Sequence, residues 1–327
     1  MQYGREWHTS LKLANGKVLV IGGQSSSIAY LNSSELYDST TGTWTSLSRM
    51  NYARAYHTAS LLTNGKVLVA GGQSSFGVHL NTAELYDPST GIWTSTGIMN
   101  YARAFHTASV LTNGKVLVTG GAYINNNYLN TAELYDPSTG LWMNTGVMNY
   151  IRASHTSSVL TNGKVLVTGG FYSSIYLNSA ELYDPLTEIW TITANMSYTR
   201  LSHTSSILAN GNVLVVGGFG GSFLNSSEVY NSSTEQWTTT GNMINARRYH
   251  IAVVLMNGKV FVTGGHGSSL YKSTELYNPS TGLWTTTADM TYPRRSPSAV
   301  LLTNGEVLVI GGASTAGNLN SSELYRS

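Results

Sequence analysis

The sequence predicts an all-β chain folded as a seven-bladed β-propeller, because one unit of four short strands recurs seven times. In each unit a Gly-Gly pair follows an Asn-Gly pair by seven residues and precedes a Glu-Leu/Val-Tyr triplet. Successive triplets lie 47 to 49 residues apart, at Glu35, Glu84, Glu133, Glu181, Glu228, Glu275 and Glu323. Composition agrees, since charged residues make up only 10% while there are 34 glycines and 21 tyrosines, a balance typical of strands and turns.

The unit at residues 50–98 shows how one copy becomes four strands. Asn64-Gly65 is the strongest short hairpin signal, because both residues tolerate positive φ. Gly71-Gly72 ends the second strand, residues 73–80 are expected to form a variable loop, and Pro88-Ser-Thr-Gly91 has the composition of a β-turn. The four predicted strands span residues 57–62, 66–70, 82–87 and 92–96.

The repeats fill the sequence, so we expect a single domain over residues 1–327. The approximate repeats are 1–49, 50–98, 99–147, 148–195, 196–242, 243–289 and 290–327. A tryptophan closes six units, at Trp44, Trp93, Trp142, Trp190, Trp237 and Trp284, and the seventh unit reaches only its third strand at Tyr325. We expect either that the chain is part of a longer protein or that the last blade has three strands and an exposed edge.

These motifs resemble a known repeat. Arg-x-x-His, Asn-Gly-Lys-Val-Leu-Val-x-Gly-Gly, Glu-Leu-Tyr-Asp and the spaced Trp are similar to the kelch motif. The variant resembles the kelch repeats of bacterial proteins and of the central domain of galactose-oxidase-like enzymes, and the resemblance covers the whole chain. It implies a propeller fold but not a function, because one fold hosts many functions.

An arginine and a glutamate repeat in every unit and a histidine repeats in six, and all three are interpreted as scaffold. The arginine before the first strand and the glutamate of the third strand should meet at one end of each blade, giving seven buried ion pairs. The alternative is an anion-binding ring of arginines. A histidine recurs in six units, with Pro297 in the seventh, and is expected to form structural hydrogen bonds rather than a metal site.

Function is expected where the repeats differ, on the one face that carries both variable segments. The first segment is the pair of residues between the repeated Arg and His, and the second is the loop after Gly-Gly. Trp7, Tyr56, Phe105 and Tyr249 are predicted to form a partial aromatic ring at the channel mouth, and Arg248 with Arg295 to hold a carboxylate or phosphate. The predicted ligand-binding residues are Glu6, Trp7, Tyr56, Phe105, Arg248, Tyr249, Arg295, Tyr30, Phe76, His79, Tyr123, Tyr128, Tyr172, Phe219 and His266.

Aromatic residues among adaptable polar ones suit a protein or peptide partner, so we expect a non-catalytic binding scaffold. A carbohydrate-binding propeller is the alternative, since sugars stack on aromatic faces. The net charge of +2 argues against a nucleic-acid partner, and no apolar run is long enough for a membrane span. Sequons at Asn32, Asn195, Asn225, Asn231 and Asn320 favour a secreted or cell-surface location only weakly.

We expect no enzyme, no metal and no cofactor. A galactose-oxidase-like reaction is disfavoured because such enzymes use a copper site with a Tyr–Cys cross-link, and this chain has no cysteine. The residues outside the repeat pattern that could support chemistry are His79, His266 and Glu6, which lie in separate units.

Overall fold

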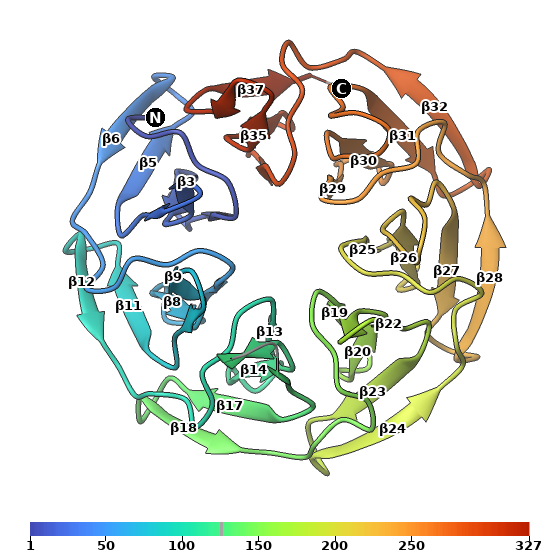
Figure 1. Ribbon diagram of the computed structural model, residues 1–327, viewed down its shortest axis with the longest axis horizontal. Coiled ribbons are helices and arrows are strands. Elements are labelled where there is room, and N and C mark those ends of the chain that lie inside the picture. Colours follow the sequence, from blue (N-terminus) through green and yellow to red (C-terminus); the bar gives the residue numbers. More distant parts are fainter. Residues whose placement is uncertain (125–126, 327) are drawn as a thin grey trace.

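The computed structural model, which describes residues 1–124 and 127–326, confirms the predicted fold class. Seven antiparallel sheets stand around a central axis like the blades of a wheel (Figure 1). The first four blades contain β1 (Thr9–Lys12), β2 (Val18–Ile21), β5 (Ser34–Asp38) and β6 (Thr43–Ser46); β7 (Thr58–Leu61), β8 (Val67–Ala70), β11 (Ala83–Asp87) and β12 (Ile92–Ser95); β13 (Thr107–Val110), β14 (Val116–Thr119), β17 (Ala132–Asp136) and β18 (Leu141–Asn144); β19 (Thr156–Val159), β20 (Val165–Thr168), β23 (Ala180–Asp184) and β24 (Ile189–Thr193). The last three contain β25 (Thr204–Ile207), β26 (Val213–Val216), β27 (Ser227–Asn231) and β28 (Gln236–Thr240); β29 (Ile251–Val254), β30 (Val260–Thr263), β31 (Thr274–Asn278) and β32 (Leu283–Thr287); β33 (Ser298–Leu301), β34 (Val307–Ile310) and β37 (Ser322–Tyr325).

Each blade runs from the axis outward in chain order, and only the last sheet has three strands. The innermost strands contact one another around the axis, and β1 meets β33, so blades 1 and 7 close the wheel. The second strand of every blade is fully buried because it lies in the middle of its sheet and packs against both neighbouring blades, which explains its run of β-branched and leucine residues.

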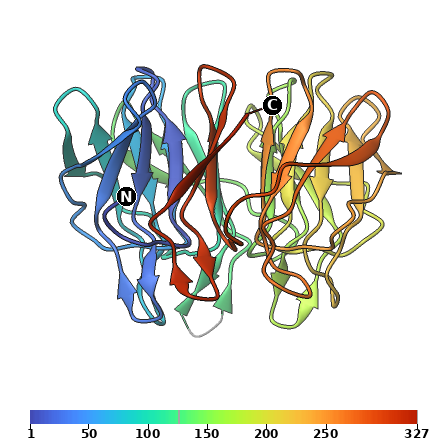
Figure 2. The ribbon, with the colours of Figure 1, turned by 90° about the horizontal axis from the view of Figure 1, so that it is seen from above.

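The loop predicted after Gly-Gly differs from expectation, because in five blades it folds into a small hairpin. The hairpins pair β3 (Gln24–Ser26) with β4 (Ala29–Tyr30), β9 (Gln73–Ser75) with β10 (Val78–His79), β15 (Ala122–Tyr123) with β16 (Asn127–Tyr128), β21 (Phe171–Tyr172) with β22 (Ile175–Tyr176), and β35 (Ala313–Ser314) with β36 (Gly317–Asn318). Blades 5 and 6 have only single bridges there, such as Phe219 with Phe223, because their connections are shorter. Figure 2 shows hairpins projecting from one face of the wheel.

Gly71 illustrates why the Gly-Gly pair recurs. Its φ is +62°, and a Cβ atom there would lie 2.5 Å from the carbonyl oxygen of Arg103 in the next blade. We expect Gly71→Ala to lower the free energy of unfolding by more than about 1 kcal/mol, measured by urea denaturation. Gly65 is the matched control, since it has a φ of +81° but no neighbour within 4 Å of a Cβ atom. An equal loss in Gly65→Ala would contradict the close approach as the cause.

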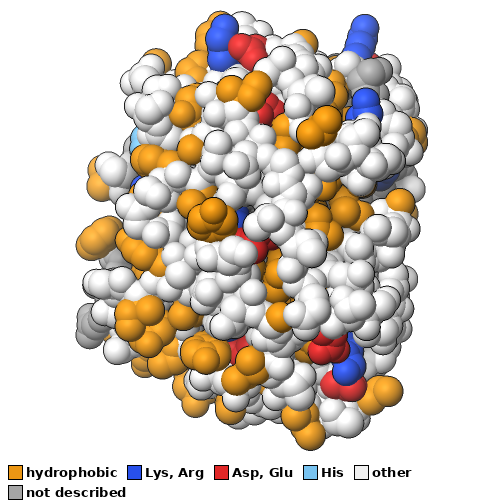
Figure 3. All heavy atoms as spheres, turned by 90° about the vertical axis from the view of Figure 1, so that its right-hand side faces the viewer, with side chains coloured by type: hydrophobic (Ala, Val, Ile, Leu, Met, Phe, Trp, Pro, Cys, Tyr) orange, Lys and Arg blue, Asp and Glu red, His pale blue; other side chains and the backbone are white. Residues whose placement is uncertain are grey.

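On the side shown in Figure 3, the outer wall of the wheel is largely polar with scattered hydrophobic side chains and few charges. Its exposed apolar residues include the first residues of four of the outermost strands, Ile92, Leu141, Ile189 and Leu283. Among the described residues, no helix has the length and hydrophobicity needed to cross a membrane.

Candidate ligand-binding cup at the channel mouth

The seven repeated arginines are structural, as the ion-pair interpretation predicts. Every one has 0% of its side chain exposed, and each lies 2.7–2.9 Å from its glutamate. In blade 2, Arg54 also donates to the backbone oxygens of Gly71 and Thr82, while Glu84 accepts from the backbone N–H of Asn51. Because no arginine of this set reaches solvent, the alternative of an anion-binding ring is wrong.

The repeated histidines link neighbouring blades near the axis. The Nε2 atom of His57 lies 2.9 Å from Thr9 Oγ1 of the preceding blade, and His8 Nε2 of blade 1 lies 2.7 Å from Ser298 Oγ of blade 7. Burial lowers the pKa of His8 and of His106 to about 3, with nearby arginines adding to the effect. These imidazoles are therefore neutral hydrogen-bonding groups at pH 7.

Next to the histidines, seven non-glycine residues with a φ of 50° to 57° surround the channel mouth. They are Trp7, Tyr56, Phe105, Ser154, Ser202, Tyr249 and Ser296. Each is joined to the next by a backbone hydrogen bond, from Tyr56 N to Trp7 O at 3.1 Å through to Ser296 N to Tyr249 O at 2.9 Å. This left-handed conformation is unfavourable for bulky residues. The backbone hydrogen bonds between blades stabilise it and hold the side chains toward the axis.

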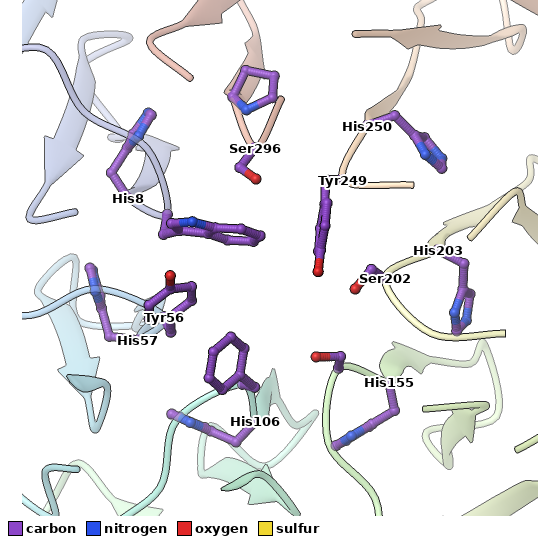
Figure 4. A pocket seen from close by; sticks show the side chains of 14 residues that line it. His8, Tyr56, His57, His106, His155, Ser202, His203, Tyr249, His250 and Ser296 are labelled. Atoms are coloured by element: carbon purple, nitrogen blue, oxygen red, sulfur yellow. The ribbon is translucent and has the colours of Figure 1, made fainter. Parts of the chain in front are cut away.

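Trp7, Tyr56 and Phe105 follow one another on one side of the ring, and on the other side Tyr249 lies between Ser202 and Ser296 (Figure 4). Trp7 and Tyr56 have ring centroids 4.8 Å apart, Tyr56 and Phe105 4.3 Å, and Tyr249 meets Trp7 edge-on at 4.9 Å. The four aromatic residues that the sequence places at the mouth thus lie in contact and narrow the channel. Burial raises the pKa of the Tyr56 hydroxyl, whose oxygen donates to Gln24 Oε1 at 3.3 Å.

A cup of about 900 Å³ opens over this ring between the hairpins. Nine of the predicted ligand-binding residues line it, namely Tyr30, Tyr56, Phe76, His79, Phe105, Tyr128, Phe219, Arg248 and Tyr249. Trp7 lines the adjoining channel space of about 280 Å³ together with the histidines. Glu6, Arg295, Tyr123, Tyr172 and His266 lie outside the lining of both spaces.

Arg248 and Arg295, predicted to hold an anion together, make different contacts in the structure. Arg295 binds Glu6 of blade 1, with Nε and Oε2 3.3 Å apart. Arg248 instead lies over the rings of Phe219 and Tyr249, each with its centroid 4.8 Å away, and over Phe223 at 5.4 Å. Within the described residues Arg248 has no carboxylate partner, and its buried Nε has no hydrogen-bond acceptor.

Sequence reasoning misses several residues of the cup. Gln24 and Gln73 line it and accept hydrogen bonds from Tyr56 and Tyr30 respectively, and Tyr176 contributes from the fourth hairpin. Both glutamines follow Gly-Gly directly, where the backbone bridges Glu6 to Gln24 and Ala55 to Gln73. The sequence could have indicated these two glutamines as cup residues, because the other repeats have Ala, Phe or His at the same position.

Comparisons with known proteins show similarity to a family model and to solved structures. A search of curated proteins finds no match. A fungal alcohol oxidase described as having catalytic diversity among the AA5 family, solved in complex with copper, has a TM-score of 0.83 and 20% identity. The similarity covers 99% of this chain and 74% of that chain. At this identity it establishes a shared fold.

The oxidase nevertheless corrects the expectation of a non-catalytic scaffold that is not an enzyme. That expectation rests on the absence of cysteine and of a grouped set of catalytic residues in the sequence, whereas the same fold over 99% of this chain occurs in an alcohol oxidase. Over residues 1–124 and 127–326, no three His, Cys, Asp or Glu side chains are grouped to hold a metal ion.

The kelch resemblance itself is confirmed. The model of the KLHDC2/KLHL20/DRC7 Kelch-repeats domain matches residues 7–218 and 152–312, which together span most of the propeller. The chain belongs to this family of kelch-repeat domains.

Proposed function

We propose that the cup at the channel mouth binds a carboxylate-bearing ligand, and that this ligand is an acidic segment of a protein partner. The observation that carries the proposal is Arg248, a cation held on aromatic rings at the cup wall with no carboxylate partner among the described residues. None of the described residues that line the cup is Asp or Glu. An incoming carboxylate would supply the missing partner, as a charge-assisted hydrogen bond.

The size and surface of the cup support a short segment rather than a broad interface. Its volume of about 900 Å³ lies at the upper end of the range of about 300–1,000 Å³ that ligand pockets span. Tyr30, Tyr56 and Phe105 offer flat faces, and Gln24 and Gln73 offer amide groups to a peptide backbone. Kelch propellers generally bind proteins, which supports a protein as the source of the segment.

Panning a displayed library of random dodecapeptides against the intact protein tests this proposal. We expect the selected peptides to be enriched in Asp and Glu. Arg248→Met keeps the bulk of the side chain but removes its charge, so binding of a selected peptide should weaken at least about tenfold, because a hydrogen bond to a charged group contributes about 1.5–3 kcal/mol.

Two arginine variants are matched controls. Arg326 is 81% exposed in its side chain and lies at the edge of blade 7, so Arg326→Met should not change binding. Arg295→Met should weaken binding less than Arg248→Met, because its charge is already paired with Glu6. Selected peptides without acidic residues, or an equal loss in all three variants, would refute an anion site at Arg248.

A further inference from the structure

A neck of the central channel adjoins the cup. This neck is the space of about 280 Å³ lined by the seven mouth residues of positive φ, the six repeated histidines and Pro297. Tyr56, Phe105, Ser154 and Tyr249 line both the neck and the cup. Because the two spaces share these walls, a ligand held in the cup can extend one group into the neck.

Hydroxyl groups give the neck its hydrogen-bonding capacity. Ser154, Ser202, Tyr249 and Ser296 each bring one to its lining. Figure 4 shows the side-chain oxygen atoms of Ser202, Tyr249 and Ser296 directed toward the channel axis. A hydroxyl both donates and accepts a hydrogen bond, so the neck can bind a group of either kind.

Ser296 gives the most specific indication of a ligand. The residue is 8% exposed, and its buried Oγ has no hydrogen-bond partner among the described residues. Pro297 follows it where the other six blades have a histidine, and proline offers no donor. A buried hydroxyl without a partner is unfavourable, and a ligand group in the neck would supply the partner.

The neck is uncharged. None of the described residues that line it is Asp, Glu, Lys or Arg. Burial lowers the pKa of His8, His106 and His250 to about 3 and that of the other three histidines well below its usual value, so all six imidazoles are neutral at pH 7. A charged group in the neck would be buried without a counter-charge, which favours an uncharged ligand group.

We infer that the neck binds an uncharged amide or hydroxyl group, which forms a hydrogen bond with Ser296 while its apolar stem packs against Trp7 and Tyr56. That this group is a side chain of the partner segment, such as Asn or Gln, rests on the proposed function. Arg248 lies 4.8 Å from the ring centroid of Tyr249, which also lines the neck. The inserted side chain is therefore expected to be close in sequence to the acidic residue.

Propionamide, propionate and propylamine are probes of one size and three charges near neutral pH. Saturation-transfer NMR titrations with the intact protein measure their binding. We expect propionamide to bind more tightly than propylamine, and Ser296→Ala to weaken propionamide binding about two- to tenfold, because one neutral hydrogen bond is lost. Ser280→Ala, at an exposed position between β31 and β32, is the matched control and should bind propionamide as the wild type does.

Three results would overturn the inference: no binding of propionamide, propylamine binding as tight as that of propionamide, or equal propionamide binding by the wild type and Ser296→Ala. Propionate should bind through Arg248 and should not depend on Ser296. Absence of acidic peptides from the panning, with Ser296-dependent propionamide binding intact, would refute the proposed function alone. Selection of acidic peptides without that dependence would refute the neck site alone.

Panning with Ser296→Ala tests whether the inserted group belongs to the partner segment. Peptides selected by this variant should still be acidic, but Asn and Gln should be rarer next to the acidic residue than in peptides selected by the wild type. Equal frequencies would contradict the insertion of a segment side chain into the neck.

Discussion

Replacing Arg103 with methionine is expected to lower the free energy of unfolding by about 3–5 kcal/mol, the range found when one partner of a buried ion pair is removed. Arg103 is fully buried, with Nη2 2.7 Å from Glu133 Oε1 and Nη1 2.8 Å from the carbonyl oxygen of Gly120. The variant leaves the Glu133 carboxylate and the Gly120 carbonyl in a dry interior without this partner. Urea denaturation followed by tryptophan fluorescence measures the loss.

Lys115→Met in the same blade is the control. Lys115 and Asp136 also form an ion pair, at 3.4 Å, but 30% and 21% of their side chains are exposed. Pairs in such surroundings contribute about 0–1 kcal/mol, so this variant should change stability little. In the double variant Arg103→Met, Glu133→Leu, no buried charge is left unpaired, and part of the stability should return. A loss in Arg103→Met no larger than that in Lys115→Met would contradict a structural role for the buried pairs.

The sequence predicts the scaffold well because each structural requirement appears in every blade. The strands predicted in residues 50–98 correspond to β7, β8, β11 and β12 with ends shifted by at most one residue. Arg54 and Glu84 are predicted to meet because strand direction places them at one end of a blade, and they lie 2.9 Å apart. A contact that must be made seven times leaves the same residues in seven places, which one sequence is enough to reveal.

The cup is predicted only in outline, because its geometry comes from contacts between unlike blades. Alternation of strand direction predicts that Tyr56 and Tyr249 lie on one face. It does not predict the edge-on contact of Trp7 with Tyr249, which depends on the width of the channel. The partner of Arg295 lies 289 residues away at Glu6, and they meet only because blade 7 closes against blade 1. A single residue that differs in each blade gives no repeated signal from which such a contact can be deduced.

The enzyme question shows the same limit. Fold and repeat are strongly encoded, yet the same propeller occurs in a copper alcohol oxidase with 20% identity. What a kelch wheel does depends on the few side chains at its mouth, so the function has to be argued from residues such as Arg248 rather than from the repeat.

Acidification below pH 6.5 is expected to destabilise the protein steeply, because the buried histidines can take up protons only when the chain unfolds. His8, His106 and His250 have pKa values lowered to about 3, mainly by burial. Between pH 6.5 and about 3 the unfolded chain binds a proton at each of these sites and the native state does not. Stability is therefore complete above pH 6.5 and falls as the pH decreases through this window.

Each of these histidines should contribute about 1.4 kcal/mol of lost stability per pH unit once the pH is well below 6.5, so these three give about 4 kcal/mol per pH unit near pH 5. Burial also lowers the pKa values of His57, His155 and His203, which add to this slope. Urea denaturation at pH 7.5, 6.0 and 5.0 measures this slope. His106→Gln should reduce the slope by about 1.4 kcal/mol per pH unit, whatever it does to stability at pH 7.5.

His79→Gln is the matched control for the slope, since His79 lies on a hairpin and is only partly buried. Burial lowers its pKa too, but the smaller shift should give a smaller change in slope. A slope near pH 5 that is the same in the wild type and His106→Gln would mean that the histidine ring is protonated in the native wheel. That result would contradict the neutral hydrogen bond from blade to blade, such as His106 Nε2 to Thr58 Oγ1 at 3.1 Å.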